Sequence, residues 1–197
     1  MDHATPARFL GSQEATAPAP VLQAVVLPAA PRRGREASRL HRQLPPPRTG
    51  LQLSVIIPAK DEAANLPATL AALAAQTDLE GRPLPPGCYE VIVLANNCTD
   101  ATAAVVRQLA GRYCHLPLYV AELSLPAAKA HVGSARRLLM DEACARLEQV
   151  GSALGIIAST DADTCVAPTW LAAIQAEIAA GAAAVGGASL RKSTPWP

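Results

Sequence analysis

The stretch Ser159-Thr160-Asp161-Ala162-Asp163 decides how the rest of this sequence is interpreted. It follows a short apolar run at residues 154–158, bounded by glycine, which is typical of a buried strand. Pro168, a few residues later, is suited to the first position of a helix. The two carboxylates are therefore predicted on the loop that leaves the carboxyl end of a strand, where open α/β sheets bind ligands.

Two aspartates one residue apart offer the oxygen ligands that a hard cation such as Mg²⁺ or Mn²⁺ prefers. A cation of this kind commonly carries a diphosphate. The alternative is a pair of solvated carboxylates, because aspartate is common in turns.

Working outward from this stretch, apolar strand patterns alternate with helical patterns along most of the chain. This order predicts an α/β fold with a mostly parallel sheet and helices on both faces. Right-handed crossovers would bring the loops that carry Glu62, Asn96 and Asp161 to one edge of the sheet, where they face one ligand. The predicted strands lie at residues 53–58, 89–94, 116–121, 154–158 and 182–188. Helices are predicted at residues 101–110, 129–150 and 168–180, and the helical spacing of Leu66, Leu70 and Leu73 predicts another after the first strand.

Composition narrows the class of protein. A chain of 197 residues has room for one domain with a core. Its net charge of +1 argues against nucleic acid as a partner. No apolar run approaches the roughly 20 residues that span a membrane, and no secretory signal opens the chain. The five cysteines show no C-x-x-C spacing, which favours reduced thiols and a cytoplasmic location.

Residues 1–50 differ from the rest because proline and alanine recur, arginine clusters at residues 32–35, and Val21 to Leu27 is the one short apolar run. Such composition predicts a disordered leader, with order beginning at Leu51.

Three motifs resemble family 2 glycosyltransferases. Leu-Ser-Val-Ile-Ile-Pro-Ala-Lys-Asp-Glu at residues 53–62 is similar to their opening strand and loop. The strand at residues 89–94, with Asn96-Asn97-Cys98-Thr99-Asp100 after it, resembles their second strand and nucleotide loop. Asp161-Ala162-Asp163 falls where these enzymes carry a metal-binding Asp-x-Asp. The resemblance covers roughly residues 51–188 and implies a GT-A fold and a nucleoside-diphosphate sugar donor.

The resemblance also implies a role for individual residues, with Mn²⁺ or Mg²⁺ as cofactor. Asn96 stands where the family usually has an acidic residue that recognises the base, and asparagine can still bond a base edge. The other implied positions are Pro58 and Glu62 on the nucleotide loop, Lys129 and Arg136 as basic contacts to the donor, Asp161 at the ribose or the metal, and Asp163 at the metal.

The resemblance implies transfer of the sugar to a hydroxyl of a sugar, lipid or other acceptor, by an inverting single displacement. Negative charge grows on the leaving diphosphate, where a cation acts as a Lewis acid. The base that accepts the acceptor proton lies downstream of Asp-x-Asp in this family, and no Asp or Glu follows Glu177. The sequence therefore predicts an incomplete GT-A domain at residues 51–197, as a fragment or as a non-catalytic nucleotide-binding domain.

Plainer interpretations stay open for several of these residues. Lys129 and Arg136 suit a solvated helix face, and Glu62 suits a helix N-terminus. Asp161-Ala162-Asp163-Thr164 also resembles the nucleophile loop of haloacid-dehalogenase-type phosphatases, in which the first aspartate attacks phosphorus. That loop normally follows the first strand of its domain, whereas here it follows the fourth.

Overall fold

Two strands rich in valine and isoleucine form the centre of the sheet, in the computed structural model that describes residues 24–25, 35–152 and 154–186. Strands β2 (Leu53–Ala59) and β3 (Tyr89–Asn96) pair in parallel, from Leu53 opposite Tyr89 to Ala59 opposite Ala95. Every residue of both strands is buried. Continuous apolar runs of this kind belong to parallel strands that are covered on both faces.

The sheet continues on both sides of this pair in the order β4-β3-β2-β5-β1-β6. Strands β4 (Leu118–Leu123) and β5 (Ile156–Ser159) are parallel to their neighbours β3 and β2. The short strand β1 (Ala24–Val25) is antiparallel both to β5 and to β6 (Ala184–Val185). The predicted α/β fold with a mostly parallel sheet is confirmed.

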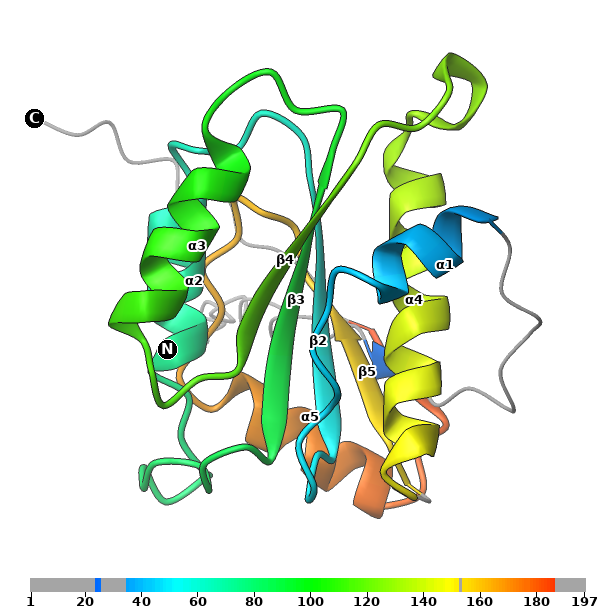
Figure 1. The fold of residues 1–197 in the computed structure, drawn as a ribbon. Helices are drawn as coiled ribbons and strands as arrows, with labels where there is room; N and C mark the ends of the chain where they lie inside the picture. Colours follow the sequence, from blue (N-terminus) through cyan, green and yellow to red (C-terminus); the bar gives the residue numbers. More distant parts are fainter. Residues whose placement is uncertain (1–23, 26–34, 153, 187–197) are drawn as a thin grey trace, which may run out of the picture.

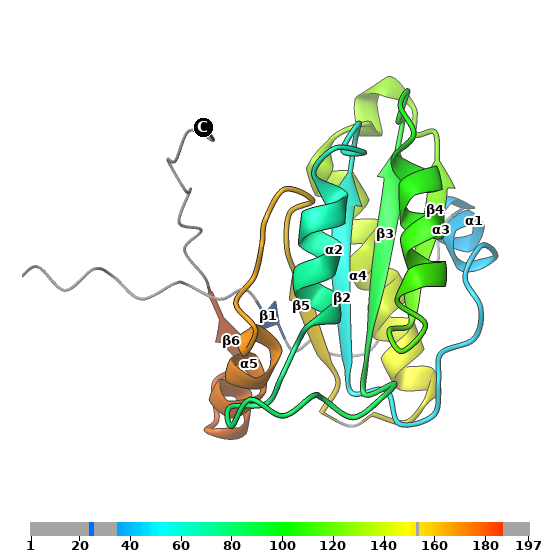
Figure 2. The same cartoon turned by 90° about the vertical axis from the view of Figure 1, so that its left-hand side faces the viewer.

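Helices cover both faces of the sheet, as Figures 1 and 2 show. Helices α2 (Leu66–Ala74), α3 (Thr102–Arg112) and α5 (Trp170–Ala179) lie on one face. Helices α1 (Arg35–His41) and α4 (Val132–Gln149) lie on the other, and a 3₁₀ turn, η1 (Ala127–Lys129), precedes α4.

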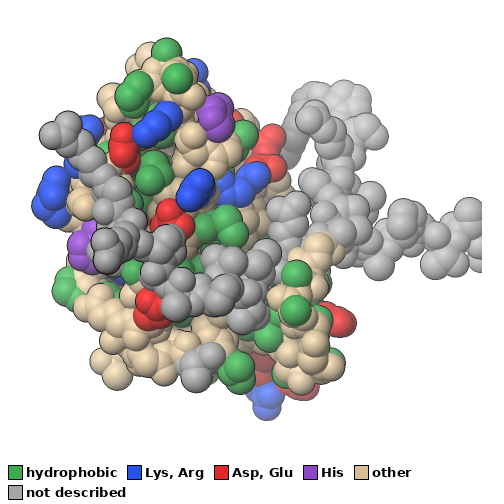
Figure 3. All heavy atoms as spheres, turned by 90° about the vertical axis from the view of Figure 1, so that its right-hand side faces the viewer, with side chains coloured by type: hydrophobic (Ala, Val, Ile, Leu, Met, Phe, Trp, Pro, Cys, Tyr) green, Lys and Arg blue, Asp and Glu red, His purple; other side chains and the backbone are tan. Residues whose placement is uncertain are grey.

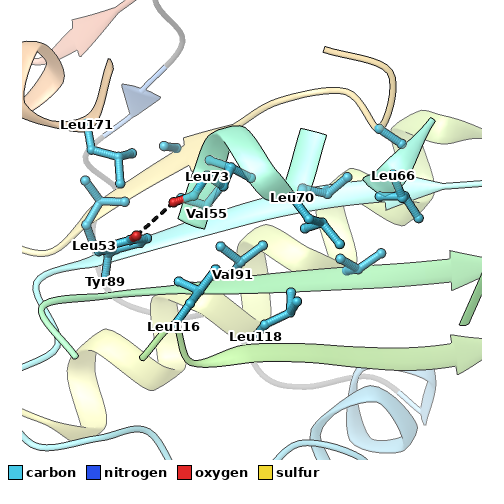
Figure 4. Close-up of a cluster of buried hydrophobic side chains, with 14 of the residues drawn as sticks. Leu53, Val55, Leu66, Leu70, Leu73, Tyr89, Val91, Leu116, Leu118 and Leu171 are labelled. Carbon is cyan, nitrogen blue, oxygen red and sulfur yellow. Dashed lines mark hydrogen bonds between the residues drawn. The ribbon is translucent and has the colours of Figure 1, made fainter. Parts of the chain in front are cut away.

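The α2 side of the core shows why these residues form a helix here. Leu66, Leu70 and Leu73 recur at helical spacing and all are fully buried against the sheet (Figure 4). The hydroxyl of Tyr89, at the start of β3, donates to the carbonyl of Leu73 at 2.8 Å. The helix end is therefore fixed to the strand by a satisfied buried polar group as well as by packing.

The prediction that order begins at Leu51 is wrong for residues 35–50. Helix α1 packs against α4, with Ala37, Leu40 and Leu44 buried at helical spacing. Averaging composition over fifty residues hides this short apolar stripe, because proline and arginine surround it. Most of the predicted leader, residues 1–23 and 26–34, lies outside the described residues.

Two further boundaries differ from prediction. The predicted helix at residues 129–150 is divided, because Lys129 ends η1 and α4 begins only at Val132. His131 separates them and acts as the N-cap of α4, its Nδ1 accepting from the Ser134 amide at 3.3 Å. The predicted strand at residues 182–188 is shorter, and residues 187–188 lie outside the described residues. Within the described ranges, no helix combines the length and the apolar character needed to cross a membrane.

Candidate functional site

The carboxyl ends of β2, β3 and β5 meet at one edge of the sheet because the three strands are parallel neighbours. Asn96 and Ser159 are the last residues of β3 and β5, and Pro58 is the last but one of β2. Alternation along the strands places all three on the sheet face that α4 covers, the face of Ile56 and Leu94. The fold therefore brings these positions together, as predicted.

An ion pair joins α4 to the Asp-x-Asp loop at this edge. The Arg136 guanidinium donates to Asp161 Oδ1 at 2.6 Å, and the two side chains are 33% and 63% exposed. Because the pair is partly open to water, its Coulomb energy contributes little to stability. Its consequence is positional, since it fixes a cationic group beside the first aspartate of the motif.

A hydrogen bond from helix α2 holds the Asp-x-Asp loop in place. The buried Thr69 hydroxyl donates to the carbonyl of the buried Ala162 at 2.8 Å. With Ala162 held inward, Asp161 and Asp163 on either side are exposed. Within residues 35–152 and 154–186, Asp163 makes no hydrogen bond or ion pair, so both of its oxygens are available to a ligand.

Three buried polar atoms at this edge lack hydrogen-bond partners in the part of the chain that the structure describes. They are Asn96 Oδ1, Ser159 Oγ and Arg136 Nε. Most buried polar atoms in folded proteins have partners, because an unpaired one costs free energy. They lie at the same carboxyl edge of the sheet, which makes this edge a candidate site for a polar ligand.

Two other predicted site residues already have partners within the protein. Glu62 Oε2 accepts from Asn65 Nδ2 at 2.8 Å just before α2, where a carboxylate also suits the helix dipole. Lys129 Nζ lies 3.4 Å from Glu36 Oε1 of α1. The ammonium of Lys129 is thus directed toward α1, and its role as a donor contact stays a prediction.

The two groups of acidic residues in this region differ in how well they suit a cation. Asp161 and Asp163 offer hard oxygen ligands that are exposed and mostly unpaired, which fits Mg²⁺ or Mn²⁺. Ligand atoms of Asp61, Cys98 and Asp100 also lie within 4.8 Å of one another. Their carboxylate oxygens, however, already accept backbone amides, so this second group serves to join two loops.

Hydrogen bonds to these carboxylates lower the pKa of both aspartates. Hydrogen bonding from the Thr99 amide holds the pKa of Asp61 below its usual value, and that from the Thr102 hydroxyl does the same for the pKa of Asp100. Both carboxylates are therefore ionised at neutral pH and are strong acceptors.

Comparison with known protein families identifies the family of this chain. The family model described as "Glycosyl transferase family 2" matches residues 54–196, which include every strand end described above. The chain belongs to glycosyl transferase family 2. The match confirms the resemblance seen in the sequence, and the family's GT-A architecture agrees with the parallel sheet and its covering helices.

Two solved structures illustrate what this family 2 chain is similar to. One is S. aureus TarS 1-349 in complex with UDP-GlcNAc, with 23% identity, coverage of 66% of this chain and 32% of that one, and a TM-score of 0.45. Another is the mannosyltransferase PcManGT from Pyrobaculum calidifontis in complex with GDP-Man and Mn2+, with 24% identity, coverage of 70% and 36%, and a TM-score of 0.44. The chain spans about a third of the length of these structures. No curated protein matches it significantly.

Sequence reasoning missed the residues that hold the site loop of this family 2 chain in place. Thr69 is one, and Gln76 is another, since its side chain donates to the Ala167 carbonyl at 2.8 Å and accepts from the Leu171 amide at 3.0 Å. The available signal was a polar side chain within or just after the buried leucine stripe of α2.

Proposed function

We propose that this chain binds a nucleoside-diphosphate sugar at the carboxyl edge of its sheet, with a divalent cation, for transfer of the sugar to an acceptor hydroxyl. Membership of glycosyl transferase family 2 supports the class of reaction. The UDP-GlcNAc bound by TarS and the GDP-Man and Mn2+ bound by PcManGT support the kind of donor and cofactor.

The grouping of unpartnered buried polar atoms carries the proposal. Asn96 Oδ1, Ser159 Oγ and Arg136 Nε come from two strand ends and a helix, and each has hydrogen-bonding capacity that the described protein leaves unused. A nucleotide presents both donors and acceptors, so it can satisfy an amide, a hydroxyl and a guanidinium together.

We assign the cation to Asp161 and Asp163 and the base to Asn96, with Pro58 and Glu62 on the adjoining loop. A divalent cation bound there supplies Lewis-acid stabilisation of the negative charge on the leaving diphosphate. Arg136 adds a fixed positive charge next to Asp161 and so also stabilises the negative charge on the leaving diphosphate. Transfer by a single displacement inverts the anomeric centre, and the acceptor hydroxyl loses its proton to a base.

We also propose a reducing, cytoplasmic setting, which the presence of five free cysteines supports. The phosphatase interpretation of Asp161 is not pursued, because the family match accounts for the same motif.

Calorimetry with Mn²⁺ and a panel of UDP- and GDP-sugars tests the proposal. We expect binding that requires the metal and that Asp163→Ala abolishes, because this substitution removes an exposed carboxylate that makes no hydrogen bond or ion pair within the described residues. Glu177→Ala is the matched control, since it removes an exposed carboxylate from α5, the helix that follows the same loop. Binding that persists without metal, or that both variants lose equally, would overturn the assignment.

A further inference from the structure

The loops that follow β2 and β3 are joined by reciprocal hydrogen bonds. In one direction, Asp61 Oδ1 accepts the amides of Thr99 at 2.6 Å and Asp100 at 3.3 Å. The Thr99 hydroxyl donates to the same oxygen at 3.1 Å. One carboxylate from the first loop thus holds the backbone of the second.

In the other direction, successive amides of the first loop donate to side chains of the second. The Asp61 amide donates to Cys98 Sγ at 3.4 Å, and the Glu62 amide donates to Thr102 Oγ1 at 2.9 Å. The Ala63 amide donates to Asp100 Oδ2 at 3.0 Å. We call this set of contacts between residues 61–63 and 98–102 the loop clasp.

Backbone strain is concentrated in the same two loops. Asp61 has φ 57° and Asn97 has φ 53°, and no other non-glycine residue in the described part of the chain has a positive φ. Left-handed conformations are costly for such residues and persist where surrounding contacts enforce them. The enforcing contacts are the clasp at Asp61 and, at Asn97, two side-chain hydrogen bonds to the Leu125 backbone at 2.9 and 3.0 Å.

The residues assigned to the donor adjoin the clasp directly. Glu62 lies within the first loop, and Asn96, which is 3% exposed with an unpartnered Oδ1, immediately precedes the second. Asp61 Oδ1 and both oxygens of Asp100 accept protein donors, so these three oxygens are used to order and join the two loops.

We propose that Asp61 and Asp100 are positioning residues: their clasp makes the two loops one rigid unit that presents Glu62 and Asn96 to the nucleotide of the donor. The proposal rests on the proposed function for the identity of the ligand. The coupling of the loops is independent of it and can be measured without any ligand.

Three substitutions distinguish loss of the clasp hydrogen bonds from other effects of changing the residue, such as added backbone strain. Asp61→Gly removes the carboxylate while glycine accepts φ 57° freely, so backbone strain is not added. Asp61→Asn keeps an acceptor oxygen and a residue type that tolerates this conformation. Asp78→Gly is the matched control, because Asp78 Oδ1 likewise accepts the amides of Glu80 and Arg82, in the loop at the opposite end of β3.

Amide hydrogen exchange measured by NMR tests the coupling. We expect Asp61→Gly to speed exchange of the Thr99 and Asp100 amides, and Asp100→Ala to speed exchange of the Ala63 amide in the opposite loop. Asp61→Asn should restore most of the protection, and Asp78→Gly should leave these amides unchanged. Unchanged exchange across the clasp in both variants would overturn the proposal.

Binding of UDP or GDP with Mn²⁺, measured by calorimetry, tests the positioning role. Asp61→Gly should weaken binding about tenfold, as loss of a charge-assisted hydrogen bond does, while Asp61→Asn and Asp78→Gly stay near the parent value. Parent-like binding by Asp61→Gly overturns the positioning role. If the parent chain binds neither nucleotide, the proposed function fails, and the exchange experiment still decides the clasp.

Discussion

At the scale of single residues, Arg146 is the most unusual feature of the core. It is the largest fully buried side chain in the described structure, and it forms a two-pronged ion pair with Glu90 at 2.8 and 2.7 Å. Its third contact is the carbonyl of Pro45 at 2.7 Å, and the Ser54 hydroxyl donates to Glu90 at 2.7 Å. Burial alone lowers the pKa of Arg146, but the hydrogen bonds and charge of Glu90 raise it more, so Arg146 stays charged.

Breaking this pair on one side should be costly. We expect Arg146→Met to lower the free energy of unfolding by about 3–5 kcal/mol, because Glu90 is left as a buried charge without its partner. The double variant Arg146→Met with Glu90→Leu should recover most of that loss. Urea denaturation measures both.

The exposed ion pairs of Arg82 provide the comparison. Arg82 contacts Asp78 and Glu80, but its side chain is 72% exposed. Arg82→Met should therefore change the unfolding free energy by less than about 1 kcal/mol. Equal losses of unfolding free energy for Arg82→Met and Arg146→Met would contradict the expectation that breaking the buried pair with Glu90 is more costly than breaking an exposed pair.

The lowered pKa of Asp61 predicts how its contribution to stability changes at acidic pH. Its folded-state pKa is held below the ordinary value of 3.8 by the Thr99 amide, so its contribution to the folded state is complete above that value. The contribution is lost as the pH falls through the lower, folded-state pKa. Carboxyl ¹³C shifts followed by NMR should show Asp61 titrating below its ordinary value of 3.8, and titration at or above that value would contradict the clasp.

At the scale of elements, α1 shows that the folded unit extends beyond the family match. The match begins at residue 54, whereas α1 covers α4 with the fully buried Leu40. The next residues also support the edge strand β4, because the Gln43 side chain accepts the Glu122 amide and donates to the Glu122 carbonyl, each at 2.9 Å. An edge strand covered in this way offers fewer free backbone groups for pairing with another chain.

Removing the α1 contact should therefore destabilise the whole domain. We expect Leu40→Ala to lower the free energy of unfolding by about 2–5 kcal/mol, the range for a buried leucine that leaves a cavity. Arg42→Ala, an exposed change next to the same helix, should have little effect. Thermal unfolding compares the two, and a Leu40→Ala protein as stable as Arg42→Ala would mean that α1 is dispensable.

What the sequence predicts at this scale depends on how local the signal is. The apolar runs at β2 and β3 and the leucine spacing of α2 are local patterns, and each predicted its element correctly. The site loops follow from topology, because parallel strands bring their carboxyl ends together. The clasp depends on pairs such as Asp61 with Thr99, 38 residues apart, and no local pattern specifies them. The ion pair between Arg136 and Asp161 is likewise not specified by any local pattern, although the sequence predicts both as site residues.

At the scale of the whole molecule, charge is spread over the surface. The face that carries α1 and α4 mixes basic and acidic side chains over its described part (Figure 3), in keeping with a net charge of +1. A mixed surface gives little long-range attraction to a polyanion. Under the proposed function, recognition of an anionic donor would then depend on local groups such as Arg136 and a cation at Asp161 and Asp163.

Ligand-dependent stability tests this conclusion on the entire chain. A ligand at a hundred times its Kd adds about 2.7 kcal/mol to the folded state, which for a domain of this size raises Tm by about 5–10 °C. We expect that rise with Mn²⁺ and a UDP- or GDP-sugar together. Neither component alone should produce it, because the cation screens the diphosphate from the carboxylates that hold it. In Asp163→Ala the rise should disappear while the ligand-free Tm stays close to the parent value, since Asp163 has no contact to lose within the described chain. A similar rise in Asp163→Ala would show that the stabilisation comes from another site and that the strand-edge aspartates do not bind the donor.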